Sequence, residues 1–154
     1  MGRSLKGMVG VGLFVGAVVL SLYGCATMES QPAAPSLYKR LGGREGIALV
    51  VGDFVGNMAA DPRVNERFKG MQPAAVEKLK SNLADQICDA TGGPCSYLGR
   101  DMRTVHTGMN ITDAEFSALV EDLVKALDKK GVGAKEKSEL LALLAPMKPD
   151  IVGR

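Results

Sequence analysis

The chain has 154 residues and carries 19 basic against 17 acidic side chains, a formal net charge of +2. Arg3 and Lys6 account for the whole excess, so the chain beyond them holds 17 basic and 17 acidic residues and is neutral. This balance offers no basic patch and argues against nucleic acid as a partner. Residues 36–152 are long enough to form one domain with a hydrophobic core.

The N-terminal segment is typical of a secretory signal. Arg3 and Lys6 are followed by an uncharged, mostly apolar run to Cys25, which predicts a signal peptide over residues 1–24. The letters LYGC at its end resemble the lipobox of bacterial lipoproteins, in which the cysteine is acylated and becomes the mature N-terminus. An uncleaved membrane anchor and plain secretion are the alternatives, since residues 7–28 carry no charge and are just long enough to span a bilayer. All three interpretations place the domain outside the cytoplasm.

Residues 25–35 are predicted to be the lipidated cysteine and a tether, because they are small, polar and proline-bearing. Ala26 and Thr27 follow Cys25, with no aspartate at the next position. By resemblance to lipoprotein sorting in Gram-negative bacteria, this favours a periplasm-facing lipoprotein of the outer membrane.

The first half of the domain shows helical periodicity. The letters SLYKRLGG indicate a short helix with Ser36 as its N-cap and a Gly-Gly pair as its end. Asp61-Pro62 predicts the start of a short helical turn toward Phe68. Between these two elements, apolar residues recur on one helix face: Ile47, Val50, Val51, Phe54, Val55 and Met58.

A second long helix is predicted over about residues 74–90, and the letters TGGP end it. Its apolar stripe consists of Val76, Leu79, Leu83 and Ile87. A short helix follows and also carries one apolar stripe, formed by Met102, Val105, His106 and Met109.

The C-terminal third is helical as well. Thr112 and Glu115 form a capping box for a helix that ends near Lys129-Lys130-Gly131. A last, leucine-rich helix covers about residues 134–144 and ends before Pro146. The sequence contains no strand pattern and no internal repeat, so the predicted fold class is all-α.

His106 is the single histidine of the chain, and the residues alone leave several interpretations open. A histidine on an apolar helix face is usually an ordinary core residue. Acid–base catalysis needs a carboxylate or nucleophile beside it, and Asp101 is the nearest along the chain. A zinc site would have to use Cys88, Cys95 and His106, whose spacing matches no common zinc framework. Haem needs one neutral imidazole and an apolar cleft between helices, and the sequence supplies both ingredients.

Cys25 is assigned to lipidation, and the other two cysteines lie within the domain. Cys88 and Cys95 are seven residues apart across a turn sequence. In an oxidising compartment a disulfide between them is one interpretation, and two free thiols are the other.

Several stretches, in their order and spacing, resemble the truncated haemoglobins of group I. They are SLYKRLGG, VVGDF, ADPRV, RFKG, TGGPCSYLGRDM, VHTGMNITDAEF and LLALLAPMKPDIV. The resemblance covers about residues 36–152. It implies a truncated globin-like two-over-two helical sandwich around haem b, with His106 as the proximal ligand of the iron.

The resemblance also implies which side chains surround the haem. Phe68 is expected to pack against the haem face, with Phe54 behind the distal pocket. Arg103 is expected near a haem propionate, and Tyr97 in the loop at the haem edge. The other expected haem neighbours are Val55, Leu79, Leu83 and Ile87 on the distal side, and Met102, Val105, Ile111, Phe116 and Val120 on the proximal or inner side.

Two positions depart from the family pattern. Many group I members place a tyrosine after the phenylalanine of DF and often a glutamine on the distal helix, and both donate to the gas ligand. Here those positions are Val55 and Leu83, so the distal pocket is expected to be unusually apolar and to retain dioxygen weakly. Gln86 is the nearest amide and either turns toward the ligand or faces solvent or a neighbouring helix. Lys80 and Met58 are the candidates for an internal sixth iron ligand.

The resemblance implies reversible binding of the diatomic gases O₂, NO and CO, and it favours a ligand-binding protein over an enzyme. A small haem redox or electron-transfer protein is the first alternative. NO dioxygenase is another, and it would need a separate reductase because the chain has no flavin or nicotinamide module. A cofactor-free helical scaffold is a further alternative. An apolar pocket without acid–base groups argues against a peroxidase.

Overall fold

The computed structural model describes residues 34–154. The predicted signal peptide over residues 1–24, the lipidation of Cys25 and nearly all of the tether lie outside the described residues. The elements in chain order are α1 (Leu37–Arg40), α2 (Gly43–Ala60), the 3₁₀ helix η1 (Asn65–Phe68), α3 (Pro73–Ala90), α4 (Met102–His106), α5 (Asp113–Lys129), α6 (Ala134–Leu144) and the 3₁₀ helix η2 (Ala145–Asp150). Within residues 34–154 the only β contact is an isolated bridge between Ile111 and Val152. Over the same range, no helix combines the length and apolarity that crossing a membrane requires.

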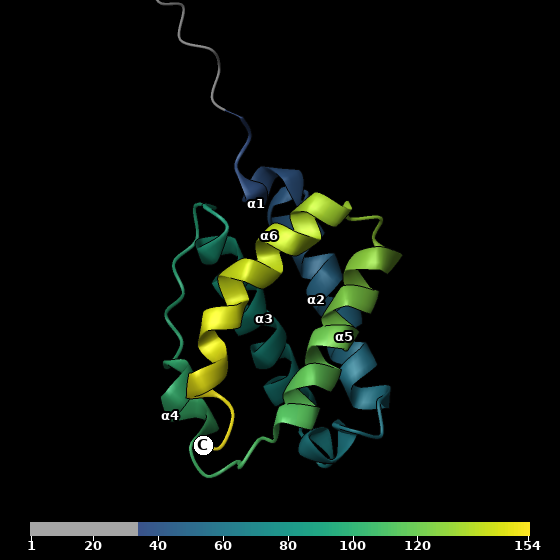
Figure 1. Cartoon of the computed structure of the whole chain (residues 1–154), viewed down its shortest axis with the longest axis vertical. Helices are drawn as coiled ribbons and strands as arrows, with labels where there is room; N and C mark the ends of the chain where they lie inside the picture. Colours follow the sequence, from purple (N-terminus) through teal and green to yellow (C-terminus); the bar gives the residue numbers. More distant parts are fainter. Residues whose placement is uncertain (1–33) are drawn as a thin grey trace, which may run out of the picture. The chain divides into compact units, whose positions relative to one another are not determined.

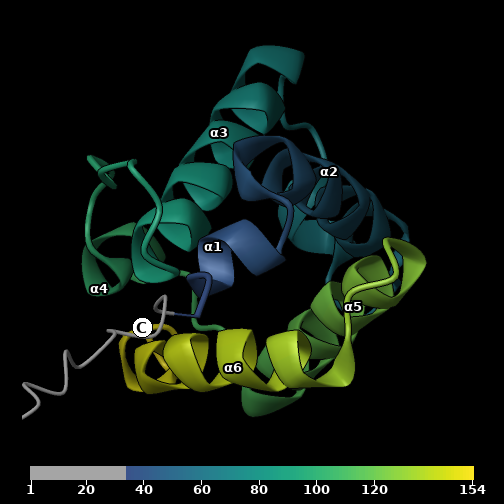
Figure 2. The same cartoon turned by 90° about the horizontal axis from the view of Figure 1, so that it is seen from above.

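Helix α2 is the centre of the fold, and it contacts both α3 and α5. Figure 2 shows α2 and α3 on one side of the domain and α5 and α6 on the other, with the short α1 between them. The predicted apolar face of α2 is buried, as Val51 (1% exposed) and Phe54 (4%) illustrate. The all-α prediction is confirmed for the described part of the chain.

The helix ends follow from local side-chain hydrogen bonds. Ser36 Oγ accepts from the Lys39 amide at 3.5 Å and caps α1. Thr112 Oγ1 accepts from the Glu115 amide at 3.2 Å, and the Thr112 amide donates to Glu115 Oε2 at 2.8 Å. This reciprocal pair satisfies the backbone amides of Thr112 and Glu115 at the start of α5. Both predicted N-caps are confirmed.

The short helix predicted toward Phe68 is present as η1, but it begins at Asn65 and not at Pro62. Asp61 is the C-cap of α2, and its carboxylate accepts from the Arg63 amide at 2.9 Å. The Val64 and Asn65 amides donate to the Asp61 carbonyl at 3.1 and 2.8 Å, which closes a single turn before η1. At the other end of the domain, the chain does not leave helical structure at Pro146. It continues as η2, where proline is tolerated in the first turn.

The loop between α3 and α4 is tied to the end of α3. Cys88 and Cys95 form a disulfide, which decides between the two interpretations left open by their spacing. Cys88 is fully buried. On the surface side, Arg44 Nη1 donates to Asp85 Oδ1 at 2.8 Å and to Cys95 Sγ at 3.1 Å. The start of the loop that leads to α4 is therefore held against both α3 and α2.

Candidate haem-binding site

His106 is the last residue of α4, a short helix that begins at an aspartate cap. Asp101 Oδ1 accepts from the Thr104 amide at 2.9 Å, and Asp101 Oδ2 accepts from the Thr104 hydroxyl at 2.7 Å. These hydrogen bonds from Thr104 lower the pKa of the Asp101 carboxyl. Because Asp101 is engaged as a helix cap, it does not serve as the partner that acid–base catalysis at His106 would need.

The imidazole of His106 is oriented by the backbone of its own helix. Its Nδ1 lies 2.7 Å from the carbonyl oxygen of Met102. A carbonyl oxygen can only accept, so Nδ1 donates in this contact. In a neutral imidazole with this hydrogen bond the lone pair is on Nε2. Histidines that bind metals are commonly held in this way, with the second ring nitrogen donating to a carbonyl or carboxylate. The side chain thus fits the role of a single axial ligand.

The structure contradicts the zinc site that would use Cys88, Cys95 and His106. Cys88 and Cys95 are joined to each other, so neither thiol is free to ligate a metal. Within residues 34–154 no group of three or more His, Cys, Asp or Glu side chains lies close enough to hold a metal ion.

The predicted distal residues come from α2, η1 and α3 and lie together. Phe54 and Val55 on α2 are buried (4% and 5% exposed), and so is Ile87 on α3 (4%). Phe68, Leu79 and Leu83 are half-buried and pack against the same hydrophobic core. All six side chains thus belong to, or pack on, one hydrophobic core, and their role as a distal wall beside haem stays a prediction.

The predicted proximal residues are only half-buried. They follow one another from α4 into the first half of α5, and they are Met102, Val105, His106, Ile111, Phe116 and Val120. Apolar side chains usually lie more deeply in a domain core. A set of half-buried apolar residues around one oriented imidazole fits a flat apolar cofactor seated against α4 and α5.

Two predicted site residues have their polar groups engaged elsewhere. The Arg103 guanidinium is exposed and bound to Asp150, with Nη2 at 2.8 Å and Nε at 3.1 Å from Oδ1. The Tyr97 hydroxyl donates to the Arg100 carbonyl at 2.8 Å within its own loop, and burial raises the pKa of that hydroxyl. The predicted contact of Arg103 with a haem propionate would require its pair with Asp150 to open.

Gln86 faces a neighbouring helix. Its Nε2 is 3.5 Å from the sulfur of Met102 on α4 and 3.5 Å from the sulfur of Met147 in η2. Thioether sulfur is a weak acceptor, so this amide is held only loosely between α3, α4 and η2. The structure corresponds to the second of the two orientations expected for Gln86.

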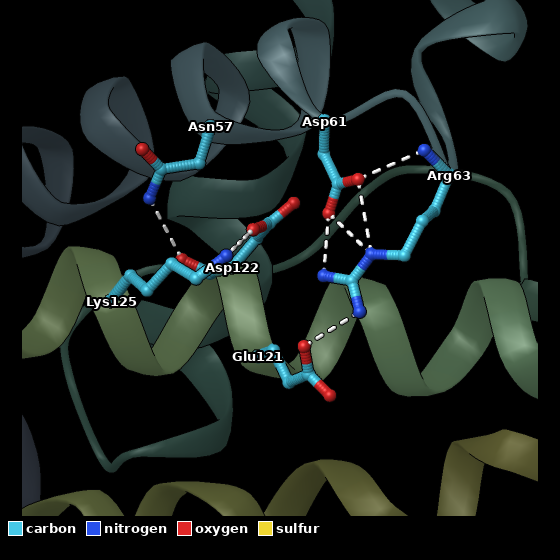
Figure 3. Close-up of polar contacts among 6 residues, drawn as sticks. All are labelled: Asn57, Asp61, Arg63, Glu121, Asp122 and Lys125. Atoms are coloured by element: carbon cyan, nitrogen blue, oxygen red, sulfur yellow. Dashed lines mark hydrogen bonds and ion pairs between the residues drawn. The ribbon is translucent and has the colours of Figure 1, made fainter.

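A polar cluster at the junction of α2 and α5 escaped the sequence analysis (Figure 3). Asp122 is 1% exposed, and its Oδ1 accepts from Lys125 Nζ at 2.8 Å. Asn57 Nδ2 donates to the Asp122 carbonyl at 3.0 Å. Arg63 joins the two helices by contacting Asp61 Oδ2 at 2.6 Å and Glu121 Oε2 at 2.7 Å. Asn57, Asp61, Arg63, Asp122 and Lys125 line an open depression of about 340 Å³. Their contacts hold the end of α2 on α5, while the second carboxylate oxygen of Asp122 is buried without a hydrogen-bond partner among the described residues.

The Asp61–Arg63 pair should make stability depend on acid pH. Hydrogen bonds from Arg63 lower the pKa of the Asp61 carboxyl to about 2, against about 3.9 in an unfolded chain. Because the folded-state pKa is depressed, the stabilisation is fully present above pH ~4 and is lost as the pH falls toward 2. We expect parent and Asp61→Asn proteins to differ in unfolding free energy by a constant amount near neutral pH. That difference should shrink between about pH 4 and 2, and a pH-independent difference in urea titrations would contradict the prediction.

Comparison with known proteins identifies the class. The chain is 34% identical over 123 residues to a group 1 truncated haemoglobin of Mycolicibacterium paratuberculosis, a match that covers 80% of this chain and 87% of that protein. A group 1 truncated haemoglobin of Tetrahymena thermophila is 28% identical over 120 residues, covering 78% and 97% of the two chains.

Solved structures agree with this assignment. Truncated haemoglobin of Tetrahymena pyriformis in its Fe(III) form superposes with a TM-score of 0.72 at 28% identity, covering 78% of this chain and all of that one. A 2/2 haemoglobin of a Synechococcus species, solved with covalently attached haem, gives 0.70 at 32% identity, with the same coverage. The fold is therefore that of the truncated 2/2 globins. Residues 36–152 match the family model described as bacterial-like globin, and the chain belongs to that family.

Proposed function

We propose that this chain is a globin outside the cytoplasm that reversibly binds diatomic gases at the iron of haem b held by His106. The observation that carries the proposal is the contact of His106 Nδ1 with the Met102 carbonyl at 2.7 Å. It occupies Nδ1 with a hydrogen bond and orients the ring, so that Nε2 is the nitrogen available to a metal. Truncated haemoglobins are among the relatives of the chain, which supports the same assignment.

Haem held by His106 would supply an iron able to bind a gas molecule. The residues of this chain would do the rest. The half-buried proximal residues would cover one haem face, and Phe68 would cover the edge of the other. Val55, Leu79 and Leu83 are apolar and would exclude water without donating a hydrogen bond. We therefore expect dioxygen to be retained less well than in a relative that carries a distal tyrosine, whereas CO, which depends less on a donor, should be affected less.

The proposed location outside the cytoplasm rests on two features. The lipobox-like LYGC predicts acylation of Cys25 and attachment to a membrane. The Cys88–Cys95 disulfide supports an oxidising compartment, since such bonds rarely persist in the cytosol. We therefore favour a lipoprotein of a Gram-negative outer membrane that faces the periplasm. Any NO dioxygenase activity would depend on a separate reductase.

Absorption spectra of the purified full-length chain with haemin test the proposal. We expect stoichiometric uptake of haem, a five-coordinate ferrous form and a CO complex. His106→Ala should lose these spectra, whereas Thr107→Ala should retain them, because its exposed hydroxyl donates only to the Arg103 carbonyl. Failure of the parent chain to bind haem, or unchanged spectra in His106→Ala, would overturn the proposal.

The ferrous spectrum also separates gas binding from electron transfer. Lys80 is paired with Glu77 at 2.8 Å, and Met58 is buried in the core at 2% exposure. A six-coordinate ferrous spectrum that disappears in Lys80→Ala or Met58→Leu would favour the electron-transfer alternative.

A further inference from the structure

The loop that follows His106 has little structure of its own. It spans residues 107–111 and leads from α4 to the capping box of α5. Gly108 has φ +83°, and Asn110, with φ +50°, is the one non-glycine residue of positive φ among residues 34–154. Within the loop itself, one backbone hydrogen bond joins the Met109 amide to the His106 carbonyl at 3.0 Å. The position of the loop must therefore be set by contacts from outside.

Arg67 provides the strongest outside contact. Its Nη1 donates to the Met109 carbonyl at 2.6 Å, and its Nε donates to Glu115 Oε1 at 2.8 Å. The same guanidinium thus binds both the loop after His106 and the first turn of α5. The two side chains of the ion pair lie at the surface, at 32% and 19% exposure, and charge-assisted hydrogen bonds of this kind are stronger than neutral ones.

The C-terminal residues hold the same loop. The Gly153 amide donates to the Ile111 carbonyl at 2.9 Å, and the Asn110 amide donates to the carbonyl of Arg154. Ile111 and Val152 form the isolated β bridge. Figure 1 shows the C-terminus beside α4 and the loop that leads to α5.

Arg67 precedes Phe68 at the end of η1, the corner whose phenylalanine is expected to pack against the haem face. We propose that Arg67 is a positioning residue that couples this corner to the loop after His106, so that the two sides of the haem site move together. The two hydrogen bonds of Arg67 join residues far apart in the sequence: Met109 is 42 residues away and Glu115 is 48 residues away. This inference rests on the proposed function, because the coupling matters for ligand binding only when His106 holds haem.

Two substitutions at Arg67 and one elsewhere test the coupling. Arg67→Met keeps the apolar stem and removes both hydrogen bonds. Arg67→Lys restores a cation that can reach Glu115 or the Met109 carbonyl but lacks the planar fork that reaches both. Arg63→Met is the matched control, since Arg63 is also bidentate to carboxylates but contacts Asp61 and Glu121 instead.

The first measurement is amide hydrogen exchange in the full-length chain without haem. Arg67→Met should speed exchange of the hydrogen-bonded amides of Thr107, Met109 and Asn110 by about 10- to 100-fold, with a smaller increase in Arg67→Lys and none in Arg63→Met. The second measurement is the iron–histidine stretching band of the ferrous haem form, which should shift or broaden in Arg67→Met alone.

The outcomes separate this inference from the proposed function. If exchange rises evenly along the chain, or if the iron–histidine band is unchanged while loop exchange rises, Arg67 is merely structural and the inference is overturned. If the parent chain binds no haem, the proposed function fails, and the coupling across the haem site fails with it. The exchange data then test a separate point, namely whether Arg67 holds the loop after His106.

Discussion

Replacing Val55 with tyrosine should slow dioxygen dissociation from the haem-loaded protein by about 10- to 100-fold, the effect of one buried hydrogen bond to a partly charged ligand. Val55 is 5% exposed on α2, directly after Phe54, at the position where the resembled family often carries a donor. Because CO depends less on a donor, its dissociation should change far less. Stopped-flow displacement of dioxygen by CO, and of CO by NO, measures both rates.

A second valine on the same helix provides the control. Val51 lies one turn before Val55 and is 1% exposed, so tyrosine at either position adds similar bulk to the core, at a cost of about 1–3 kcal/mol. Val51→Tyr should destabilise the fold without slowing dioxygen dissociation. If both variants slow dissociation equally, or if Val55→Tyr leaves the rate unchanged, Val55 does not line the ligand side of the site.

The sequence predicted best those features that depend on neighbouring residues. The caps at Ser36 and Thr112 require contacts over only three residues, and the buried face of α2 follows from helical spacing alone. The start of the short helix toward Phe68 was predicted three residues too early. The Asp61 carboxylate accepts from the Arg63 amide in a turn as it would in a helix cap, so the sequence does not distinguish the two.

Contacts between distant residues could not be predicted in this way. Arg67 stood in the motif RFKG without an assigned role, because its partner Met109 lies 42 residues away. Arg103 meets Asp150 over 47 residues, so its competition with a haem propionate has no signal in the sequence. His106 was singled out because it is the one histidine, but the carbonyl that orients its ring became visible only with the helix geometry.

The disulfide shows the same limit. A spacing of seven residues is compatible with both a bond and two free thiols, and only the turn of the chain at the end of α3 decides between them. That turn depends on Gly93. A Cβ atom at this position would lie 2.5 Å from Cys88 Sγ, 2.6 Å from Tyr38 Cδ2 and 2.8 Å from the Cys88 carbonyl oxygen. The second glycine of the TGGP sequence is therefore required by close approach of the backbone.

Gly93→Ala should consequently destabilise the domain by about 1–3 kcal/mol or more, the range for overpacking in a dense core. Reduction of the disulfide cannot relieve the clash, because the Cys88 carbonyl belongs to the backbone of α3 and stays in place. The penalty should thus persist in Cys88→Ser/Cys95→Ser protein. Urea unfolding of parent and variant chains measures it.

Gly56 provides the control for Gly93→Ala, because a Cβ atom added there would meet no other group. Gly56 lies inside α2, and no atom would come within 4 Å of an added Cβ. Gly56→Ala should therefore stabilise the domain by about 0.5–1 kcal/mol, because alanine is the better helix former. Opposite signs for Gly93→Ala and Gly56→Ala would establish that the loop carrying Cys95 is packed directly on α1 and α3. Equal stability of parent and Gly93→Ala would mean that this loop stands away from both helices and leaves α4, with His106, less firmly placed.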